Sequence, residues 1–129
     1  MPTVSIVFAA IAGFIHVLFF LIVCVWWMHP KVHKNFGIKS LDEATQFKLS
    51  FFNQGFYNLF LAIGIFAGIY LLKYQSSSNG ITLMLFCCAS MFAASIVLLV
   101  SKPNMLRGVF IQGLCPLIAI LTWWLFKNQ

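Results

Sequence analysis

The sequence predicts an all-α membrane protein, an antiparallel bundle of four transmembrane helices with both termini outside the cytoplasm. The 129 residues are 62% hydrophobic and only 8% charged, whereas about a quarter of the residues in soluble domains are charged. Four apolar runs each reach the ~20 residues that cross a ~30 Å hydrocarbon core as a helix. None has a charged residue in its interior. The expected spans are 4–28, 50–72, 81–101 and 107–126, within one membrane domain of residues 1–129.

The distribution of basic residues predicts the orientation. Six lie between the first and second spans or between the third span and the first residue of the fourth, and two lie on the opposite side. The six are Lys31, Lys34, Lys39, Lys48, Lys102 and Arg107, and the two are Lys73 and Lys127. Because basic residues concentrate in cytoplasmic loops, both termini should be periplasmic and the protein should lie in the inner membrane. The same placement explains the net charge of +6 without nucleic acid as a partner.

The first span should be retained in the mature protein, because "MPTVS" lacks the basic segment of a signal peptide. Pro30 disfavours helical geometry at His29 and ends this span, and Gly37 indicates a turn. His29 and His33 have a spacing that suits a metal, but Pro30 lies between them and no third ligand is near. No metal is therefore predicted. These histidines and the neighbouring lysines are expected to meet anionic headgroups.

The second helix should begin before the membrane, near residue 41. "SLDE", residues 40–43, is a capping-box pattern in which Ser40 caps the helix and Glu43 reaches back. No Pro or Gly follows until Gly55, so Gln46 and Lys48 should lie in water or headgroups on a continuous helix. At 1.5 Å per residue, this helix is about 45–50 Å long.

Short polar turns join the remaining spans. "QSSSNG" at 75–80 and "SKPNM" at 101–105 are brief enough to make successive helices antiparallel neighbours. The four cysteines lie inside the apolar runs and have no C-x-x-C spacing, so they are interpreted as small hydrophobic residues rather than disulfide partners.

The second span contains an unusual polar cluster in "FFNQGFYNLF", residues 51–60. At 100° per residue, Gln54, Tyr57 and Asn58 share a face with Leu61, Ile65 and Gly68, and Asn53 flanks it. "GIFAG" at 64–68 is a small-xxx-small seam that permits close helix approach. The polar residues are therefore expected to face other helices rather than lipid.

Two further polar residues are expected at compatible positions in the bundle. His16 lies near mid-membrane on a stripe of small residues that includes Ser5, Ala9 and Ala12. Gln112 lies in the fourth span at about the depth of Gln54 to Asn58. The sequence thus predicts one candidate ligand-binding site, formed by His16, Asn53, Gln54, Tyr57, Asn58 and Gln112.

Two interpretations of this cluster stay open. The first is structural, because amides and hydroxyls join membrane helices through hydrogen bonds of ~0.6 kcal/mol per pair. The second is a ligand-holding or water-filled cavity that opens toward the cytoplasm. Four polar residues within six positions exceed what pairing needs, and an ionisable His16 within a span indicates function.

The segment "NQGFYNLFLAIG", residues 53–64, resembles the signature of domain of unknown function 1304, a bacterial family of small four-span membrane proteins. His16, "FG" at 36–37 and "FIQGLCPLIA" at 110–119 follow in the expected order. The resemblance covers nearly the whole chain and marks seven positions: His16, Asn53, Gln54, Gly55, Tyr57, Asn58 and Gln112. It implies an acidic residue seven positions after the histidine, where this chain has Val23. It implies no established activity.

Three hypotheses for function follow from the sequence. The first is a non-catalytic protein that holds a small amphipathic or lipid-like molecule above the polar residues, beside aromatic walls such as Phe19, Phe20 and Phe56. The second is an enzyme on a membrane-dissolved substrate, with His16 as proton shuttle and Tyr57 as hydrogen-bond donor. The third is an accessory subunit of a membrane complex. No cofactor is predicted, membrane lipids are expected partners, and a homo-oligomer stays open.

Overall fold

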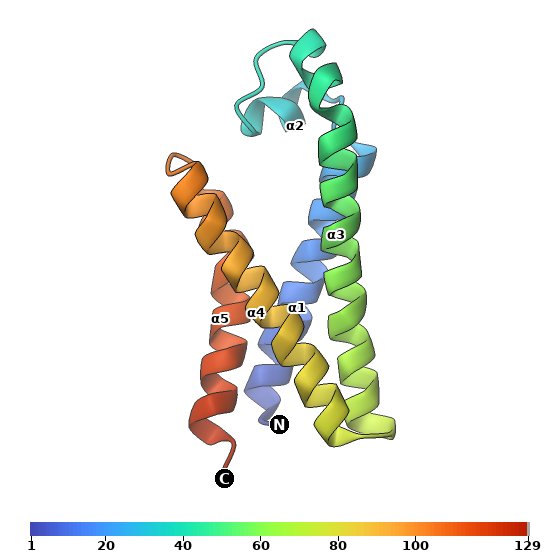
Figure 1. Cartoon of the computed structure of the whole chain (residues 1–129), viewed down its shortest axis with the longest axis vertical. Coiled ribbons are helices and arrows are strands. Elements are labelled where there is room, and N and C mark those ends of the chain that lie inside the picture. The colour runs from blue at the N-terminus through green and yellow to red at the C-terminus, as the bar shows by residue number, and fades with distance from the viewer. Residues whose placement is uncertain (129) are drawn as a thin grey trace. The chain divides into compact units, whose positions relative to one another are not determined.

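A computed structural model describes residues 1–128, which form helices joined by short connections and no strand. In chain order these are α1 (Thr3–Phe20), the π-helix η1 (Leu21–Val25), α2 (Pro30–Asn35), α3 (Leu41–Tyr74), α4 (Ser77–Ser101) and α5 (Leu106–Phe126) (Figure 1). The described residues form two compact units. One unit is His16–Phe60, and the other combines Met1–Ile15 with the chain from Leu61 onward.

Within residues 1–128, four helices are long and apolar enough to cross a membrane, as in a multi-pass membrane protein. They are Thr3–Val25, Leu41–Tyr74, Ser77–Ser101 and Leu106–Phe126. The predicted bounds of 107–126 and the extension of the second helix back to residue 41 agree closely with these. The third helix begins four residues earlier than predicted, because Ser76 caps it by accepting a hydrogen bond from the Asn79 amide at 3.4 Å.

The start of α3 confirms the predicted cap with one difference. The Glu43 amide donates to Ser40 Oγ at 3.2 Å, as expected. The Glu43 carboxylate accepts from the amide of Lys39 at 3.0 Å, one residue before the position that the capping-box pattern implies. From this cap the helix continues without interruption for 34 residues, or about 51 Å.

The connection between the first two spans contains the six-residue helix α2, which the sequence analysis did not predict. His29 caps it by accepting from the Lys31 amide at 3.3 Å. Its end is a Schellman motif, in which the Gly37 amide donates to Lys34 O and the Ile38 amide donates to His33 O. Gly37 has φ +81°, a conformation that favours glycine, so the predicted turn at Gly37 is confirmed.

Trp27 organises the core of the unit His16–Phe60. Its ring is 1% exposed and stacks on Phe51 with centroids 4.0 Å apart. Its Nε1–H donates to the carbonyl oxygen of Ala44 at 2.8 Å. Phe36 contacts both rings edge-on, so α2 and the first turns of α3 are packed around this indole. The core residues of this cluster are Trp27, Ile38 and Ala44.

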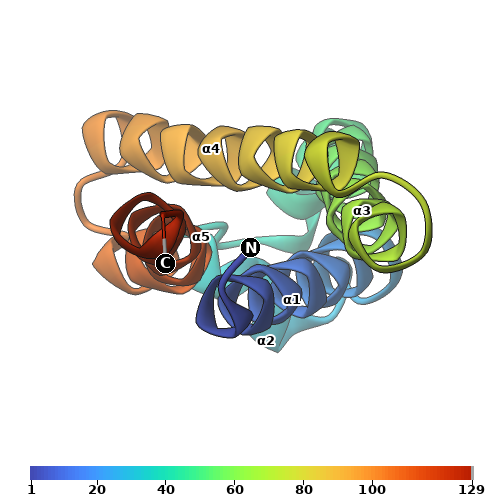
Figure 2. The ribbon, with the colours of Figure 1, turned by 90° about the horizontal axis from the view of Figure 1, so that it is seen from below.

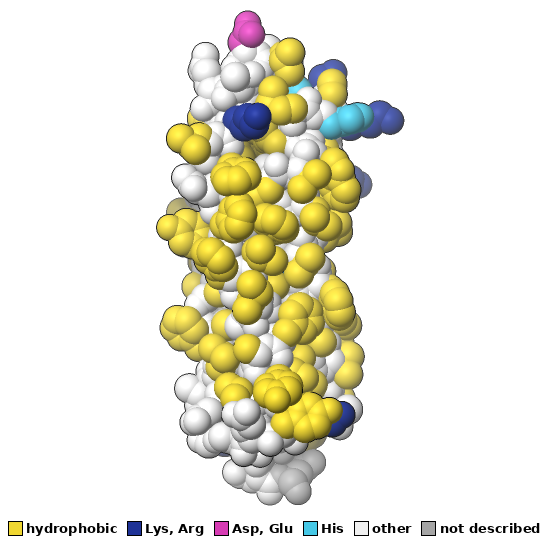
Figure 3. Space-filling model, turned by 90° about the vertical axis from the view of Figure 1, so that its right-hand side faces the viewer, with side chains coloured by type: hydrophobic (Ala, Val, Ile, Leu, Met, Phe, Trp, Pro, Cys, Tyr) yellow, Lys and Arg dark blue, Asp and Glu magenta, His cyan; other side chains and the backbone are white. Residues whose placement is uncertain are grey.

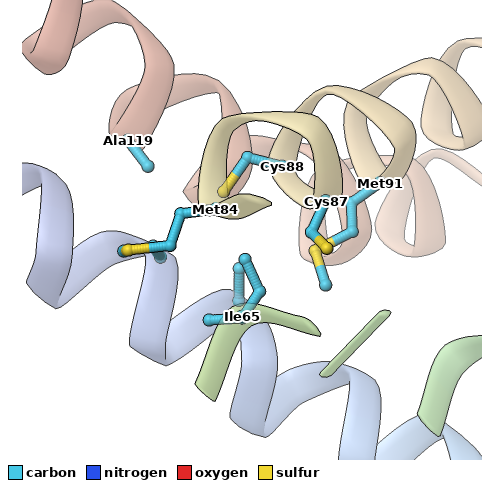
Figure 4. Packing of buried hydrophobic residues seen from close by; sticks show 8 residues of the cluster. Ile65, Met84, Cys87, Cys88, Met91 and Ala119 are labelled. Carbon is cyan, nitrogen blue, oxygen red and sulfur yellow. The ribbon is translucent and has the colours of Figure 1, made fainter. Parts of the chain in front are cut away.

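The other unit has a core of small and sulfur-containing side chains. Ile65 of α3, Met84, Cys87, Cys88 and Met91 of α4 and Ala119 of α5 meet there (Figure 4). α4 also packs against α5, and the two lie side by side near the turn that joins them (Figures 1 and 2). All four cysteines are free, as the sequence predicts.

The predicted small-residue seam in α3 is confirmed within this unit. A Cβ atom built on Gly64 would lie 2.5 Å from Cys87 Sγ, and one built on Gly68 would lie 3.1 Å from the backbone oxygen of Gly80. A side chain at either position would force these neighbours to move, so glycine favours the close approach between α3 and α4. The predicted stripe of α1 is also buried, since Ser5, Ala9 and Ala12 have no exposed surface.

Candidate functional site

Asn53, Gln54 and Tyr57 form an exposed polar stripe on the N-terminal half of α3. Tyr57 is 70% exposed, and Asn58, at the edge of this stripe, is half-buried. The predicted shared face is therefore buried only in its later part, where Ile65 and Gly68 lie. In its earlier part the polar side chains point away from the packed side of the helix, which differs from the expectation that they face other helices.

Gly55 explains this difference. A Cβ atom at Gly55 would overlap Cys24 Sγ and would lie 2.7 Å from Val23 Cγ2. The smallest residue of the cluster thus makes the contact with η1, about 100° around the helix from Gln54. Because Gly55 sets the packed side, the exposed side of the same turns carries the polar stripe.

The π-helix η1 supplies the surface that Gly55 contacts. Its wider turn is closed by the Trp26 amide, which donates to Leu21 O at 3.1 Å. Cys24 Sγ donates to the carbonyl oxygen of Phe52 at 3.3 Å and so ties η1 to α3. Val23, at the position where the family resemblance implies an acid, is 5% exposed and lies against Gly55. Single turns of π-helix occur frequently at functional sites.

An aromatic row follows the polar stripe along α3. Phe52 and Phe56 have ring centroids 5.1 Å apart, and Phe56 and Phe60 have centroids 6.1 Å apart. Phe20 and Phe56, two of the residues predicted to form aromatic walls, contact edge-on with ring centroids 5.2 Å apart. The i, i+4 spacing places this row beside Asn53 and Tyr57. The N-terminal half of α3 is therefore amphipathic, with apolar rings next to amide and phenol groups.

His16 and Gln112, the two predicted site residues outside α3, differ from the polar stripe in exposure. His16 has no exposed surface, and its ring meets Phe19 edge-on at 5.7 Å. An enzyme that used His16 with Tyr57 would need one substrate to reach a fully buried imidazole and an exposed phenol. Gln112 is half-buried on α5 and belongs to the other compact unit. Its convergence with the residues of α3 stays a prediction.

The pair His29 and His33 is not arranged as a metal site. His29 has extended backbone geometry (φ −72°, ψ 128°) and precedes α2, whereas His33 lies inside the helix and is 3% exposed. Their side chains therefore do not share one helical face. Within residues 1–128, no group of three His, Cys, Asp or Glu side chains is placed to hold a metal ion.

A groove on α3 was not singled out from the sequence. It is lined by Thr45, Lys48, Leu49 and Phe52 and has a volume of about 250 Å³. The i, i+3, i+4, i+7 spacing places these residues on one face of the helix, so this face could be recognised from the sequence. The groove combines one ammonium group, one hydroxyl group and two apolar side chains.

The chain has four membrane-length spans, and the N-terminal half of α3 is amphipathic. These features are those of a small multi-span membrane protein with a candidate ligand surface. The family model for proteins of unknown function called DUF1304 matches residues 10–124. The chain therefore belongs to the DUF1304 family. The matched segment includes His16, the whole polar stripe and Gln112. No curated protein and no solved structure matches the chain.

Proposed function

We propose that this protein is an inner-membrane, antiparallel four-helix bundle that holds a small amphipathic or lipid-like molecule in its cytoplasmic half. The observation that carries the proposal is the exposed polar stripe of Asn53, Gln54 and Tyr57 on a membrane-length helix. A ligand with a polar group and an apolar chain matches this stripe and the aromatic row beside it.

The depth of the stripe makes its exposure costly without a ligand. Residues 49–72 are uncharged and lie between Lys48 and Lys73. These two lysines are about 38 Å apart along the helix, which is close to the thickness of a bilayer with part of its headgroup regions. Asn53 and Tyr57 then lie roughly 8–14 Å below Lys48. An amide or hydroxyl group transferred to hydrocarbon without a partner costs roughly 2–7 kcal/mol.

Helix pairing alone does not account for the stripe in the unit His16–Phe60. The contact between α3 and η1 is made through Gly55 and Phe52, on a different side of the helix. Polar residues that served as helix glue would lie in such a contact. A ligand polar group, or water that accompanies it, would instead satisfy the exposed amides and phenol.

The proposed orientation places both termini in the periplasm. Six basic residues on one side against two on the other support it. Cysteines introduced within residues 75–80 should react with an impermeant maleimide in intact cells, and cysteines within 31–39 should react only after permeabilisation. Reaction at 31–39 in intact cells would reverse the orientation.

The proposed function is tested by replacing the amides with apolar groups of similar size. Gln54→Leu and Asn58→Leu should each change the free energy of unfolding by no more than about ±0.5 kcal/mol, as for other substitutions outside a packed core. Thermal unfolding in detergent measures this change. Native mass spectrometry should show that the ligand that co-purifies with wild-type protein is lost.

Gln75→Leu is the matched control, because Gln75 is an exposed amide just beyond the end of α3. It should retain the ligand. Ligand retention in Gln54→Leu would contradict the proposal. Dissociation of a wild-type oligomer in Gln54→Leu would also contradict it and would assign the stripe to contact with a second copy.

A further inference from the structure

The groove at the start of α3 has the composition of a lipid headgroup site. Lys48, at one edge, is exposed and offers three N–H donors, while Leu49, 72% exposed, and Phe52, 42% exposed, continue toward the middle of the helix. The hydroxyl of Thr45 donates to Leu41 O at 2.9 Å, so its remaining capacity is to accept a hydrogen bond. The groove thus presents charge at one end and apolar surface at the other.

The charge around the groove favours an anion. The unit His16–Phe60 has four lysines and two acidic residues, Asp42 and Glu43. The Glu43 carboxylate is occupied by the Lys39 amide. Among the described residues, no carboxylate forms an ion pair with Lys48. In Figure 3, basic, histidine and acidic side chains gather at the end where α2 and the start of α3 lie, and apolar side chains cover the surface next to them.

We propose that this groove binds an anionic phospholipid, with the phosphate at Lys48 and the first part of one acyl chain on Leu49 and Phe52. Charge complementarity and the position of Lys48 at the boundary of an uncharged span select this occupant. The volume of about 250 Å³ is below the ~300–1,000 Å³ of sites that enclose a whole drug-sized ligand. The groove is open and lined by one face of one helix, so it would contact a headgroup and the start of a chain without enclosing them.

This site goes beyond the proposed function, because its polar contacts are Lys48 and Thr45 rather than the polar stripe. A lipid in the groove is part of the surrounding membrane, whereas the molecule held at the stripe is the protein's ligand. The two proposals are therefore tested by different substitutions.

The test measures lipid binding to the purified, delipidated full-length protein by native mass spectrometry. Phosphatidylglycerol and phosphatidylcholine with identical acyl chains are titrated separately. Wild-type protein should prefer phosphatidylglycerol. Lys48→Gln should weaken phosphatidylglycerol binding by roughly five- to tenfold, and it should weaken phosphatidylcholine binding less, because the choline cation offsets the charge of the phosphate. Lys48→Arg should retain the preference, because it keeps the charge.

Lys102→Gln is the matched control, since it removes one positive charge from an exposed lysine in the other basic loop. It should change phosphatidylglycerol binding less than twofold. Leu49→Gln, which keeps the charge and alters the apolar end, should weaken both lipids. Soluble glycerol 3-phosphate should not compete at millimolar concentration, since it lacks the acyl chain.

The inference is overturned if wild-type protein binds both lipids equally, or if Lys48→Gln and Lys102→Gln have equal effects. Unchanged binding in Leu49→Gln, or competition by glycerol 3-phosphate, would also overturn it. Gln54→Leu separates the two proposals, because it should keep the phosphatidylglycerol preference even where the stripe's ligand is lost.

Discussion

Gly55 makes the close contact between α3 and η1 beside the candidate site. It is the one position in the cluster "NQGFYN" at which any side chain would collide with η1. Because α3 approaches η1 through this glycine, Gln54 and Tyr57 are exposed. A helical wheel places these residues on a common face but does not tell which face is packed, so the sequence predicted the members of the cluster and not their exposure.

Gly55→Ala should destabilise the protein by ~1–3 kcal/mol, because a new methyl group must displace Cys24 and Val23 in a packed contact. Thermal unfolding in detergent measures this loss. Gly108→Ala is the control, since its Cβ would meet Leu98 at an ordinary 3.4 Å. The control should be neutral or up to ~1 kcal/mol more stable, as expected for Gly to Ala in a helix.

The double variant Val23→Ala, Gly55→Ala separates steric overlap from other effects. Removal of the Val23 Cγ2 atom, which would lie 2.7 Å from the new Cβ, should recover part of the stability lost in Gly55→Ala. Equal losses of stability in Gly55→Ala and Gly108→Ala would show that the contact between Gly55 and η1 is not close.

The elements differ in how far local sequence determines them. The four long helices could be predicted because length, hydropathy and the Ser40 cap are local properties. The helix α2 has only six residues, too few for a periodic pattern, and it forms beside the buried indole of Trp27. The π-helix η1 lies in close contact with Gly55, about thirty residues away in the chain. Such contacts cannot be read from single-sequence patterns.

Trp27→Phe tests whether the indole hydrogen bond holds this segment to α3. The phenyl ring keeps the stacking on Phe51 but loses the donor to Ala44 O. Loss of a bond worth about 1 kcal/mol should speed amide hydrogen exchange at residues 38–44 by about fivefold and leave α4 and α5 unchanged. Trp26→Phe is the control, because Trp26 is 47% exposed. Equal rates of amide hydrogen exchange at residues 38–44 in Trp27→Phe and Trp26→Phe would contradict this role of the hydrogen bond.

At the scale of the whole molecule, a membrane-length helix carries an exposed polar surface whose hydrogen-bonding groups hydrocarbon cannot satisfy. The six site residues predicted from sequence lie at different levels of exposure. His16 is fully buried, Asn58 and Gln112 are half-buried, and the polar stripe is exposed. They are candidates because polar residues are rare in apolar spans. Their convergence depends on how helices meet, which composition and spacing do not determine.

Photo-crosslinking in cells tests the central claim most directly. Cells are supplied with a diazirine-bearing fatty acid that enters their lipids, and the irradiated protein is purified and digested with trypsin. Cleavage at Lys48 and Lys73 releases peptide 49–73, which contains the polar stripe and the aromatic row. Adducts at residues 53–60 of this peptide should disappear in the variant with Gln54→Leu and Asn58→Leu, whereas adducts at Leu49 and Phe52, where the lipid of the groove lies, should persist. The proposed ligand site would be contradicted if adducts were spread equally over α3, α4 and α5 and did not change in that variant.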